Sequence, residues 1–316
     1  MEDVADGVVA ALDVGGTSIK AGLVAADGTV TQEMRRPTGV AGGVDAVVDG
    51  IGILTEQLIA AGGPRVRAVG LGVPGIVESD AGIARYAANL GWRDLPIAAI
   101  LSQRVGLPVA LGHDVRNGAL GEARLGAGAH FGGSIYFIAI GTGIASGLVR
   151  DGAVDEGATG QAGEVGHLVV RPGGPLCGCG NHGCLEAIAS ASRIENAYAA
   201  RTGARATAKD IVTLVREGDF DADAVWTEAI AALADALASV VVLTDPGLVV
   251  IGGGLSLAGP ILVEPLVTEL TGRLTFRRPP PVVLTELGDR AGLLGAALRA
   301  WDLLAARDER GSNGEM

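Results

Sequence analysis

The stretch that decides the fold runs from Asp13 to Val24 and reads DVGGTSIKAGLV. An apolar run, Val8–Leu12, precedes it, and its own second half, Ile19–Val24, is apolar again. Two short apolar runs joined by a glycine-containing turn are typical of two antiparallel strands. The two glycines would let a ligand approach the backbone closely and would leave N–H groups for phosphate oxygens. Taken alone, the pattern fits a phosphate-binding turn and an ordinary tight hairpin equally well.

A second copy of this pattern lies further along the chain. Residues 140–149 read IGTGIASGLV, which again predicts a strand, a Gly-Thr-Gly turn and a strand. The two copies are about 130 residues apart, the size of one domain. A third glycine cluster ends a predicted strand in VVIGGGLS, residues 249–256, where adenine or ribose could lie against the backbone. The ordered set of three predicts two α/β domains with a nucleotide between them.

The rest of the chain alternates short apolar runs with helical periodicity. We expect further strands at residues 29–34, 68–73, 109–112 and 248–251. We expect helices at residues 44–61, 97–105, 117–125, 186–201, 208–216, 222–243 and 291–306, followed by a disordered polar tail.

Composition limits the classes of function. The 316 residues are 48% hydrophobic and carry a net charge of −12, so a global basic footprint for nucleic acid is absent. The start, MEDVADGVVAALD, is acidic where a secretory leader would be basic. The longest apolar region, residues 229–251, is interrupted by Asp235, Asp245 and Pro246, which predicts a helix, a turn and a strand rather than a membrane span. We expect a soluble cytoplasmic protein without nucleic-acid or membrane partners.

All cysteines of the chain lie in GPLCGCGNHGCLE, residues 174–186. Three cysteines in a cytoplasmic protein argue against structural disulfides, and Cys-x-Cys lacks the two-residue spacer of thioredoxin-like sites. A histidine upstream, in GQAGEVGHLVV (residues 160–170), completes a set of one imidazole and three thiolates that suits tetrahedral zinc better than three small core residues. We expect His182, also in this loop, to be exposed. The predicted ligands are His167, Cys177, Cys179 and Cys184.

Together these motifs resemble the actin-like, hexokinase-type ATPase fold, and specifically the ROK family of bacterial sugar kinases and related repressors, over nearly the whole chain. The resemblance implies a two-domain α/β (ribonuclease H-like) fold with a cleft between the domains. Residues 1–116 with the C-terminal helix 291–316 would form the small domain, and residues 117–290 the large domain with the zinc loop. It also implies ATP, Mg²⁺ and structural Zn²⁺ as cofactors, and a homodimer or homotetramer.

In that family the two glycine turns hold the ATP phosphates, and the late glycine cluster lies near the adenosine. Here Thr17 adds a hydroxyl donor, Lys20 adds charge, and Asp13 at its strand end is placed to hold Mg²⁺ through water. The residues assigned to ATP are Asp13, Gly15, Gly16, Thr17, Lys20, Gly141, Thr142, Gly143, Gly253 and Gly254.

The segment LGHDVRNGALGEARLG, residues 111–126, is similar to the family's Glu-Asn-Asp segment, whose aspartate is the catalytic base. Asp114 matches that aspartate. A carboxylate there can accept the proton of a sugar hydroxyl while the oxygen attacks the γ-phosphate. Local sequence explains Asp114 equally well as a helix N-cap, and the order of the motifs favours the base. His113 replaces an asparagine that touches the sugar in the family, which leaves the sugar open.

The resemblance assigns further sugar contacts around the zinc loop. Carboxylates and amides bind pyranose hydroxyls through paired hydrogen bonds. Zinc would hold two glutamates in place, while its histidine ligand offers the second ring nitrogen to a sugar oxygen. The residues assigned to the sugar are Gly75, Asn89, His113, Asp114, Glu164, His167 and Glu186.

The function implied is ATP-dependent phosphorylation of a hexose, by default glucose to glucose 6-phosphate. Alternatives within the class are N-acylmannosamine, N-acetylglucosamine, fructose or a cyclitol as acceptor, and polyphosphate as donor. A non-catalytic ROK-type sugar sensor or transcription regulator is the alternative of another class. It is disfavoured because the Asp13 turn begins almost at the N-terminus, which leaves no room for a DNA-binding helix-turn-helix.

Overall fold

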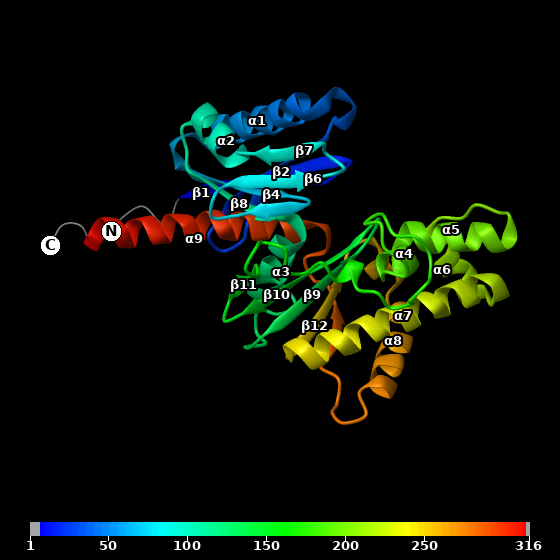
Figure 1. Ribbon diagram of the computed structural model, residues 1–316. Helices are drawn as coiled ribbons and strands as arrows, with labels where there is room; N and C mark the ends of the chain where they lie inside the picture. Colours follow the sequence, from blue (N-terminus) through cyan, green and yellow to red (C-terminus); the bar gives the residue numbers. More distant parts are fainter. Residues whose placement is uncertain (1–6, 314–316) are drawn as a thin grey trace. The chain divides into compact units, whose positions relative to one another are not determined.

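The computed structural model describes the backbone of residues 7–313 and the side chains of residues 7–310, so the acidic first six residues lie outside it. Contacts group the chain into two compact units (Figure 1). Unit 1 comprises the chain up to Leu125, residues 156–162 and the chain from Asp289 onward, and unit 2 comprises Gly126–Asp155 and Gly163–Gly288. The domain limits predicted from the sequence stay a prediction, because grouping by contacts does not test which segments fold independently.

Unit 1 is built on a five-stranded mixed sheet. Strands β1 (Val8–Val14), β2 (Ser18–Ala25) and β3 (Val30–Pro37) form an antiparallel meander. Strands β4 (Val66–Val73) and β8 (Val109–His113) continue the sheet in parallel with β1, which gives the order β3-β2-β1-β4-β8. The buried centre of β1 and β4 explains why both strands read as continuous apolar runs.

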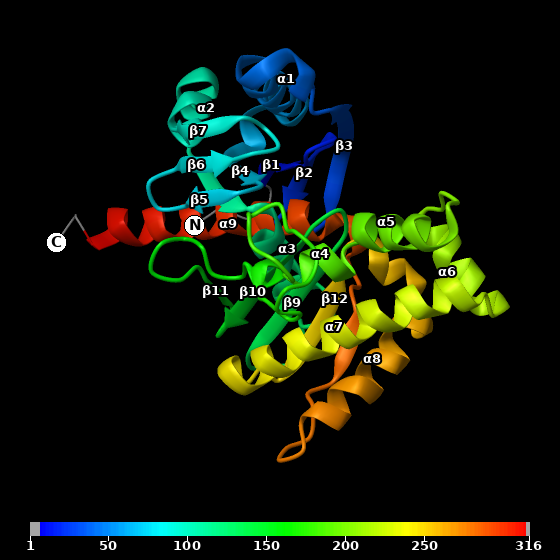
Figure 2. The same cartoon turned by 45° about the vertical axis from the view of Figure 1, so that its right-hand side comes forward.

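Helices cover both faces of this sheet (Figures 1 and 2). On one face lie α1 (Gly43–Gly62) and α2 (Ile97–Val105), whose apolar side chains at helical spacing join the core. On the other lie α3 (Asp114–Leu125) and α9 (Ala291–Asn313), which pack on each other. The helix α9 crosses the sheet closely, since a Cβ on Gly70 of β4 would lie 2.0 Å from the carbonyl oxygen of Ala296. Its start touches the end of β1, because a Cβ on Gly292 would lie 2.9 Å from the Asp13 carboxylate.

Unit 1 also carries a small antiparallel sheet that the sequence did not indicate. It consists of β5 (Ile76–Glu78), β6 (Ile83–Ala87) and β7 (Trp92–Leu95). These strands have three to five residues, too few for a clear alternation of apolar and polar positions.

Unit 2 repeats the sheet of unit 1. Strands β9 (Ile135–Ile140), β10 (Ile144–Arg150) and β11 (Ala153–Asp155) form an antiparallel meander. Strands β12 (Leu248–Gly252) and β13 (Val282–Leu284) follow in parallel with β9, in the order β11-β10-β9-β12-β13. Order and directions match those of unit 1, so the internal repeat predicted from the two glycine turns is confirmed as a repeat of topology.

The helices of unit 2 are α4 (Glu186–Ala189), α5 (Ala191–Thr202), α6 (Ala208–Glu217), α7 (Phe220–Thr244) and α8 (Pro260–Arg273). Among the described helices, only α7 is long and apolar enough to cross a membrane by length and composition. Of its apolar window, 61% is buried, and α5, α6 and α8 pack on it. A central core helix meets the same criterion, and α7 has that place in unit 2. Short 3₁₀ turns occur at Val40–Gly42, Gly63–Arg65, Val165–His167, Gly254–Ala258 and Gly288–Arg290.

Three predicted helix limits were wrong. The helix expected at 186–201 is two helices, because Ser190 is extended (φ −70°, ψ 153°) and redirects the chain. Helix α3 starts at Asp114 rather than Asn117, since the N–H groups of its first turn find an acceptor in His113. Helix α9 continues through Asn313 where a disordered tail was expected from residue 307; most residues at 307–310 are good helix formers. Helix α8 and strands β11 and β13 were not predicted.

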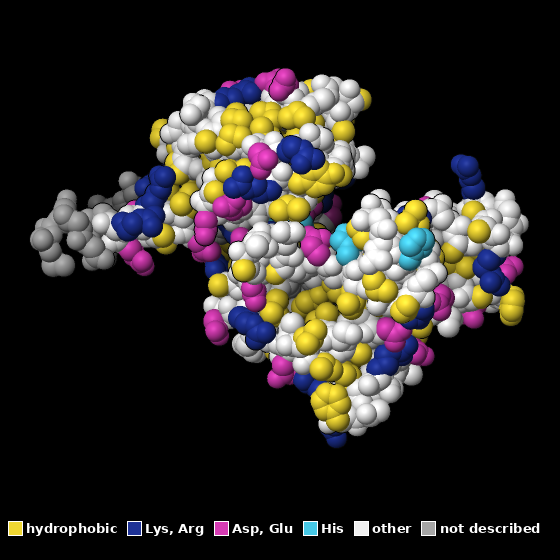
Figure 3. All heavy atoms as spheres, in the orientation of Figure 1, with side chains coloured by type: hydrophobic (Ala, Val, Ile, Leu, Met, Phe, Trp, Pro, Cys, Tyr) yellow, Lys and Arg dark blue, Asp and Glu magenta, His cyan; other side chains and the backbone are white. Residues whose placement is uncertain are grey.

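Charged side chains of both signs are interspersed on the face shown in Figure 3, where no broad patch of one sign is visible.

Candidate active site

The first glycine turn, Gly15–Thr17, joins β1 to β2. Its own hydrogen bond runs from the Gly15 N–H to the Ser18 carbonyl, 3.0 Å away. The buried Thr38 holds it from the side: its hydroxyl donates to the Gly15 carbonyl (2.6 Å) and its N–H to the Thr17 carbonyl (3.0 Å). The N–H groups of Gly16 and Thr17 have no partner among the described residues. The turn therefore presents fixed, free donors, which is what phosphate oxygens require.

Two carboxylates meet near this turn at the same edge of the sheet. Asp13 lies at the end of β1, and Asp114 follows β8 as the first residue of α3. Burial and then the charge of Asp114 raise the pKa of Asp13 to about 7, although Lys20, whose Nζ is 3.7 Å from Oδ2, opposes the shift. Burial raises the pKa of Asp114 to about 6, although the Val115 N–H, 2.7 Å from Oδ1, opposes this. A carboxyl group with a pKa near neutrality is suited to accept a proton.

The structure places three predicted sugar contacts of unit 1 in different surroundings. Asn89 lies beside the first turn, since a Cβ on Gly16 would be 3.2 Å from its Nδ2. Gly75 has a backbone reason to be glycine, with φ +90° and the carbonyl oxygen of Tyr86 only 2.1 Å from where its Cβ would stand. His113 is 5% exposed, and its Nδ1 accepts the N–H of Val115 (3.2 Å) and contacts that of Arg116 (3.4 Å). Its ring thus caps α3, and its contact with a sugar stays a prediction.

The second glycine turn, Gly141–Gly143, joins β9 to β10 in unit 2. The Gly141 N–H donates to the Gly143 carbonyl at 2.9 Å. The break at Ser190 aims the start of α5 at this turn, so that the Ala191 N–H donates to the Gly141 carbonyl (2.8 Å) and the Ser192 hydroxyl to the Thr142 carbonyl (3.1 Å). In the described part of the chain, the N–H groups of Thr142 and Gly143 have no partner. Free N–H groups beside a helix N-terminus favour an anion.

Glu186, the first residue of α4, touches the second turn directly. Its Oε2 accepts the Ile144 N–H at 3.0 Å, and a Cβ on Gly143 would lie 2.7 Å from that oxygen. Glu186 therefore requires glycine at position 143. One carboxylate oxygen is committed to the turn, which the sequence prediction of a sugar contact did not anticipate.

The loop with Glu164 and His167 lies tightly on β10. A Cβ on Gly163 would be 2.0 Å from the Ser146 carbonyl oxygen, and one on Gly166 would be 2.1 Å from that of Ile144. The Gly163 carbonyl also accepts the Ser146 N–H at 2.8 Å. The two glycines thus hold the loop against the strand, and the side chains of Glu164 and His167 are exposed upon it.

The four predicted metal ligands come together in unit 2. The ligand atoms of His167, Cys177, Cys179 and Cys184 all lie within 4.8 Å of one another. His167 Nδ1 is 3.6 Å from Cys177 Sγ, and Cys179 Sγ is 3.7 Å from Cys184 Sγ. A tetrahedral ion with Zn–N and Zn–S bonds of the usual lengths would require separations of about 3.6 and 3.8 Å. The four donors therefore fit a tetrahedral cation.

The comparisons with known proteins agree with this arrangement. The model of the ROK family matches residues 9–302. The chain belongs to the ROK family. The glucokinase of Thermotoga maritima is 35% identical over 304 residues, covering 90% of this chain and 95% of the relative. The ROK hexokinase from Thermus thermophilus has a TM-score of 0.85 at 36% identity, over 95% of this chain and 99% of that one. A ROK glucokinase from Streptomyces griseus, solved with glucose and AMPPNP, has a TM-score of 0.82 at 31% identity, over 94% and 100%. The predicted two-domain actin-like ATPase fold is confirmed.

In this ROK chain the third glycine cluster has two different roles. Gly253 (φ +76°) lies against the end of β9, where a Cβ would be 2.4 Å from the Ile140 carbonyl oxygen. Gly254 has open space beside it and lines a cavity of about 450 Å³. The cavity walls come from α5, α6 and the turn after β12, and include Glu195, Val212, Arg216, Leu255, Leu257 and Ala258.

Sequence reasoning missed these cavity walls, together with Thr38 and Ser192, which hold the two turns. None of them belongs to a motif, because each acts through a contact with a residue distant in the sequence. One local signal existed near the cavity: the Thr207–Asp210 capping box marks the start of α6, although it says nothing of a ligand.

Proposed function

We propose that this ROK-family protein is an ATP-dependent sugar kinase that transfers the γ-phosphate to a hexose hydroxyl, with glucose as the acceptor. The single observation that carries the proposal is the half-buried carboxylate pair Asp13 and Asp114, with raised pKa values, beside a turn whose N–H donors have no partner among the described residues. The similarity to glucokinases over nine-tenths of the chain supports glucose as the sugar.

Asp114 is the proposed base. Its carboxylate accepts the proton of the sugar hydroxyl, the hydroxyl oxygen forms a bond to the γ-phosphorus, and the bond from that phosphorus to the bridging oxygen of ADP breaks. The pKa of about 6 leaves Asp114 mostly ionised at neutral pH yet basic enough to take the proton. His113 contributes by capping α3, because this cap fixes the first turn of the helix and with it the direction of the Asp114 side chain.

The two glycine turns are the proposed phosphate sites. Free N–H groups of Gly16 and Thr17 in unit 1, and of Thr142 and Gly143 in unit 2, would donate to phosphate oxygens, and Lys20 would add charge. Mg²⁺ bound with ATP neutralises phosphate charge. Asp13 is the residue placed to hold it through water, because a cation would offset both the burial and the charge of Asp114 that raise its pKa.

The cavity beside Gly254 is the proposed nucleoside site. Its volume of about 450 Å³ lies within the range of small-molecule pockets. Apolar walls from Val212, Leu255 and Ala258 suit the faces of a purine.

We assign structural zinc to His167, Cys177, Cys179 and Cys184, because three thiols with one imidazole form a donor set typical of zinc. His167 directs Nδ1 toward Cys177, so Nε2 is the nitrogen left for a sugar oxygen. Glu164, Glu186 and Asn89 would hydrogen-bond the remaining hydroxyls, and Gly75 would keep the backbone beside the sugar free of a side chain. A homodimer or homotetramer in the cytoplasm, without nucleic-acid or membrane partners, completes the proposal on the family resemblance.

One observation favours a second candidate within the class. The Nδ1 atom of His113 accepts a hydrogen bond of the helix cap, at the position where the family has a sugar-binding asparagine. The preferred acceptor could therefore be N-acylmannosamine, N-acetylglucosamine, fructose or a cyclitol. A non-catalytic sensor is disfavoured, because a sensor has no need of a half-buried aspartate with a pKa near neutrality.

A coupled ADP-release assay tests the proposal across these acceptors with ATP as donor. Direct detection of the sugar phosphate tests polyphosphate as donor, because that transfer releases no ADP. We expect the highest kcat/KM with glucose and ATP. A higher value with another sugar or with polyphosphate would replace that part of the assignment. Absence of ADP release with every acceptor, from protein that binds ATP, would refute the kinase.

A further inference from the structure

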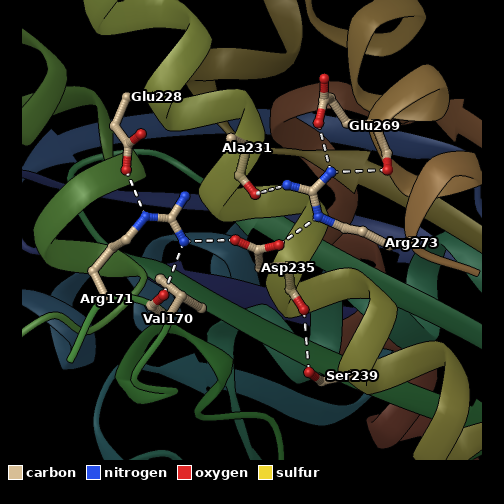
Figure 4. Close-up of polar contacts among 8 residues, drawn as sticks. All are labelled: Val170, Arg171, Glu228, Ala231, Asp235, Ser239, Glu269 and Arg273. Carbon is tan, nitrogen blue, oxygen red and sulfur yellow. Dashed lines mark hydrogen bonds and ion pairs between the residues drawn. The ribbon is translucent and has the colours of Figure 1, made fainter.

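A network of charged side chains in unit 2 joins three elements outside the proposed substrate contacts (Figure 4). Asp235, in the middle of α7, accepts from two arginines at once. Its Oδ2 receives Arg171 Nη1 at 2.5 Å, and its Oδ1 receives Nε of Arg273, at the end of α8. Arg171 also donates from Nε to Glu228 of α7 (2.7 Å), and Arg273 from Nη1 to Glu269 (2.5 Å).

Arg171 differs from its partners because its backbone belongs to the segment that carries the four proposed zinc ligands, residues 167–184, which we call the metal loop. Its carbonyl accepts the Gly174 N–H at 2.8 Å, and its own N–H donates to the Gly183 carbonyl at 3.1 Å. A Cβ on Gly183 would lie 1.6 Å from the Arg171 carbonyl oxygen, so the two arms of the loop cross here without space between them. Cys184 follows immediately, and Glu186 two residues later.

We propose that Arg171, held by Asp235 and Glu228 of α7, is a positioning residue for the metal loop and through it for the proposed sugar-binding side chains. This inference rests on the proposed function. With its guanidinium fixed to α7, the crossing point of the loop cannot rise from the core helix. Cys184 and Glu186 then keep their places relative to His167 before metal or sugar binds.

The chemistry of the network suits this role better than an isolated surface pair would. Partial burial by itself would raise the pKa of Asp235, but the hydrogen bonds from Arg273 and Arg171 outweigh it and lower that pKa below its usual value. The carboxylate therefore stays ionised and paired. The planar guanidinium of Arg171 reaches Glu228, Asp235 and the Val170 carbonyl (2.8 Å) together, which one ammonium on a flexible chain does not reproduce.

The alternative is that the network has only a structural role and holds α7 against α8. The chain offers a matched control that separates the two roles. Arg201 of α5 donates two hydrogen bonds to Asp221 of α7 (3.0 and 2.8 Å), and its guanidinium is thus bound to α7 from a helix that does not belong to the metal loop. Its removal takes away an arginine–aspartate pair from the same core helix without touching the metal ligands.

The test compares wild type with Arg171→Lys, Arg171→Ala and the control Arg201→Ala, all loaded with Zn²⁺. The first readout is the rate of zinc transfer to a chromophoric chelator, which requires no kinase activity. We expect Arg171→Ala to release zinc about tenfold faster or more, the usual effect of residues that support metal ligands, with Arg171→Lys between it and wild type. Arg201→Ala should match wild type.

The second readout separates binding from chemistry. The glucose KM of Arg171→Ala should rise several-fold while kcat changes little, because Asp114 in unit 1 is untouched. Equal zinc-release rates and an unchanged KM in both Arg171 variants would overturn the proposal, as would an equal effect of Arg201→Ala. If Arg171→Ala does not fold, Arg171→Lys decides by the same criteria. Lack of kinase activity in wild type would refute the proposed function alone, because zinc release would still report on Arg171.

Discussion

The two glycine turns occupy the same place in two copies of one sheet, yet their surroundings differ. Both join the first strand of a meander to the second, and in both the N–H groups of two residues have no partner among the described residues. In unit 1 the turn is held by Thr38, and the half-buried carboxylates of Asp13 and Asp114 lie near it. In unit 2 it is held by the start of α5 and by Glu186, next to the metal loop. The glycine turn itself is thus repeated in both units, whereas the side chains around it differ.

This difference suits the two units to different tasks: unit 1 to the chemical step and unit 2 to holding side chains in position. In unit 1, two nearby acids with raised pKa values oppose each other electrostatically, an arrangement that is costly for folding and useful for proton transfer. In unit 2, glycine contacts, a tetrahedral donor set and charged networks hold side chains in place. Variants in unit 1 should therefore change turnover, and variants in unit 2 should change affinity.

Asp114→Asn should have the largest effect. An amide cannot accept the hydroxyl proton, so kcat should fall about a hundredfold or more, as expected for loss of a general base. The ADP-release assay measures this, with circular dichroism as a check on folding. Asp289→Asn is the control, because Asp289 is an exposed aspartate that contacts Lys20, the partner of Asp13, and not Asp114; it should retain most activity. A near-normal rate for Asp114→Asn would remove it from the chemistry.

Removal of a metal ligand should come next. Cys184→Ser should bind far less zinc by elemental analysis, and its glucose KM should rise about tenfold to a hundredfold, because the loop loses its cross-link. The control is His182→Ala. His182 lies in the same loop, is exposed and is not one of the four proposed ligands, so this variant should keep the metal. If the Cys184 variant shows a lower kcat at unchanged KM, the assignment of positioning to unit 2 is wrong.

The pH dependence should reflect unit 1 alone. The base works ionised, so kcat/KM should rise with pH through about 6 and fall about tenfold for each unit below it. The same shift has the opposite sign for stability. A carboxyl group with a raised pKa in the folded state favours folding below its ordinary pKa of 3.8, and this contribution is lost as pH rises through about 6 for Asp114 and 7 for Asp13. Urea titrations across pH 4–8 on wild type and Asp114→Asn measure it; identical pH profiles of the two would contradict the raised pKa.

The smallest effect should follow from loosening each turn. Thr38→Val removes the hydroxyl that holds the first turn, and Ser192→Ala the one that holds the second. A hydrogen bond of this kind contributes about 1 kcal/mol, so the KM for ATP should rise about fivefold in each variant. Because Thr38 is buried, Thr38→Val should also lower the free energy of unfolding, whereas Ser192→Ala should leave it nearly unchanged. Equal losses of stability would show that the two turns are held alike.

The sequence was most informative where chemistry depends on spacing. The cysteine loop and His167 were chosen by residue type and interval, and the structure brings their ligand atoms together. Asp13 and Asp114 were found in separate motifs a hundred residues apart. Their proximity depends on the order β1-β4-β8, which neither motif contains.

What the sequence did not reveal are contacts between elements distant along the chain. Glu186 bonds to Ile144, Arg171 to Asp235, and the cavity wall combines three helical segments; no periodic pattern marks any of them. The break between α4 and α5 had only one local sign, a serine at position 190, which is a common N-cap residue. Strands of three residues, such as β11 and β13, are too short to have a pattern.

The place of α9 has a consequence for how the protein is made. This helix covers one face of the unit 1 sheet and packs against Asp13 through Gly292, yet it follows the helices and strands of unit 2 along the chain and leaves the ribosome after them. All of unit 2 is synthesised before it. Synthesis of unit 1 therefore begins before that of unit 2 and ends after it. The face of the unit 1 sheet that α9 covers stays exposed until α9 has been synthesised. A nascent chain can therefore complete the proposed metal loop while Asp13 still lacks the helix that packs against it.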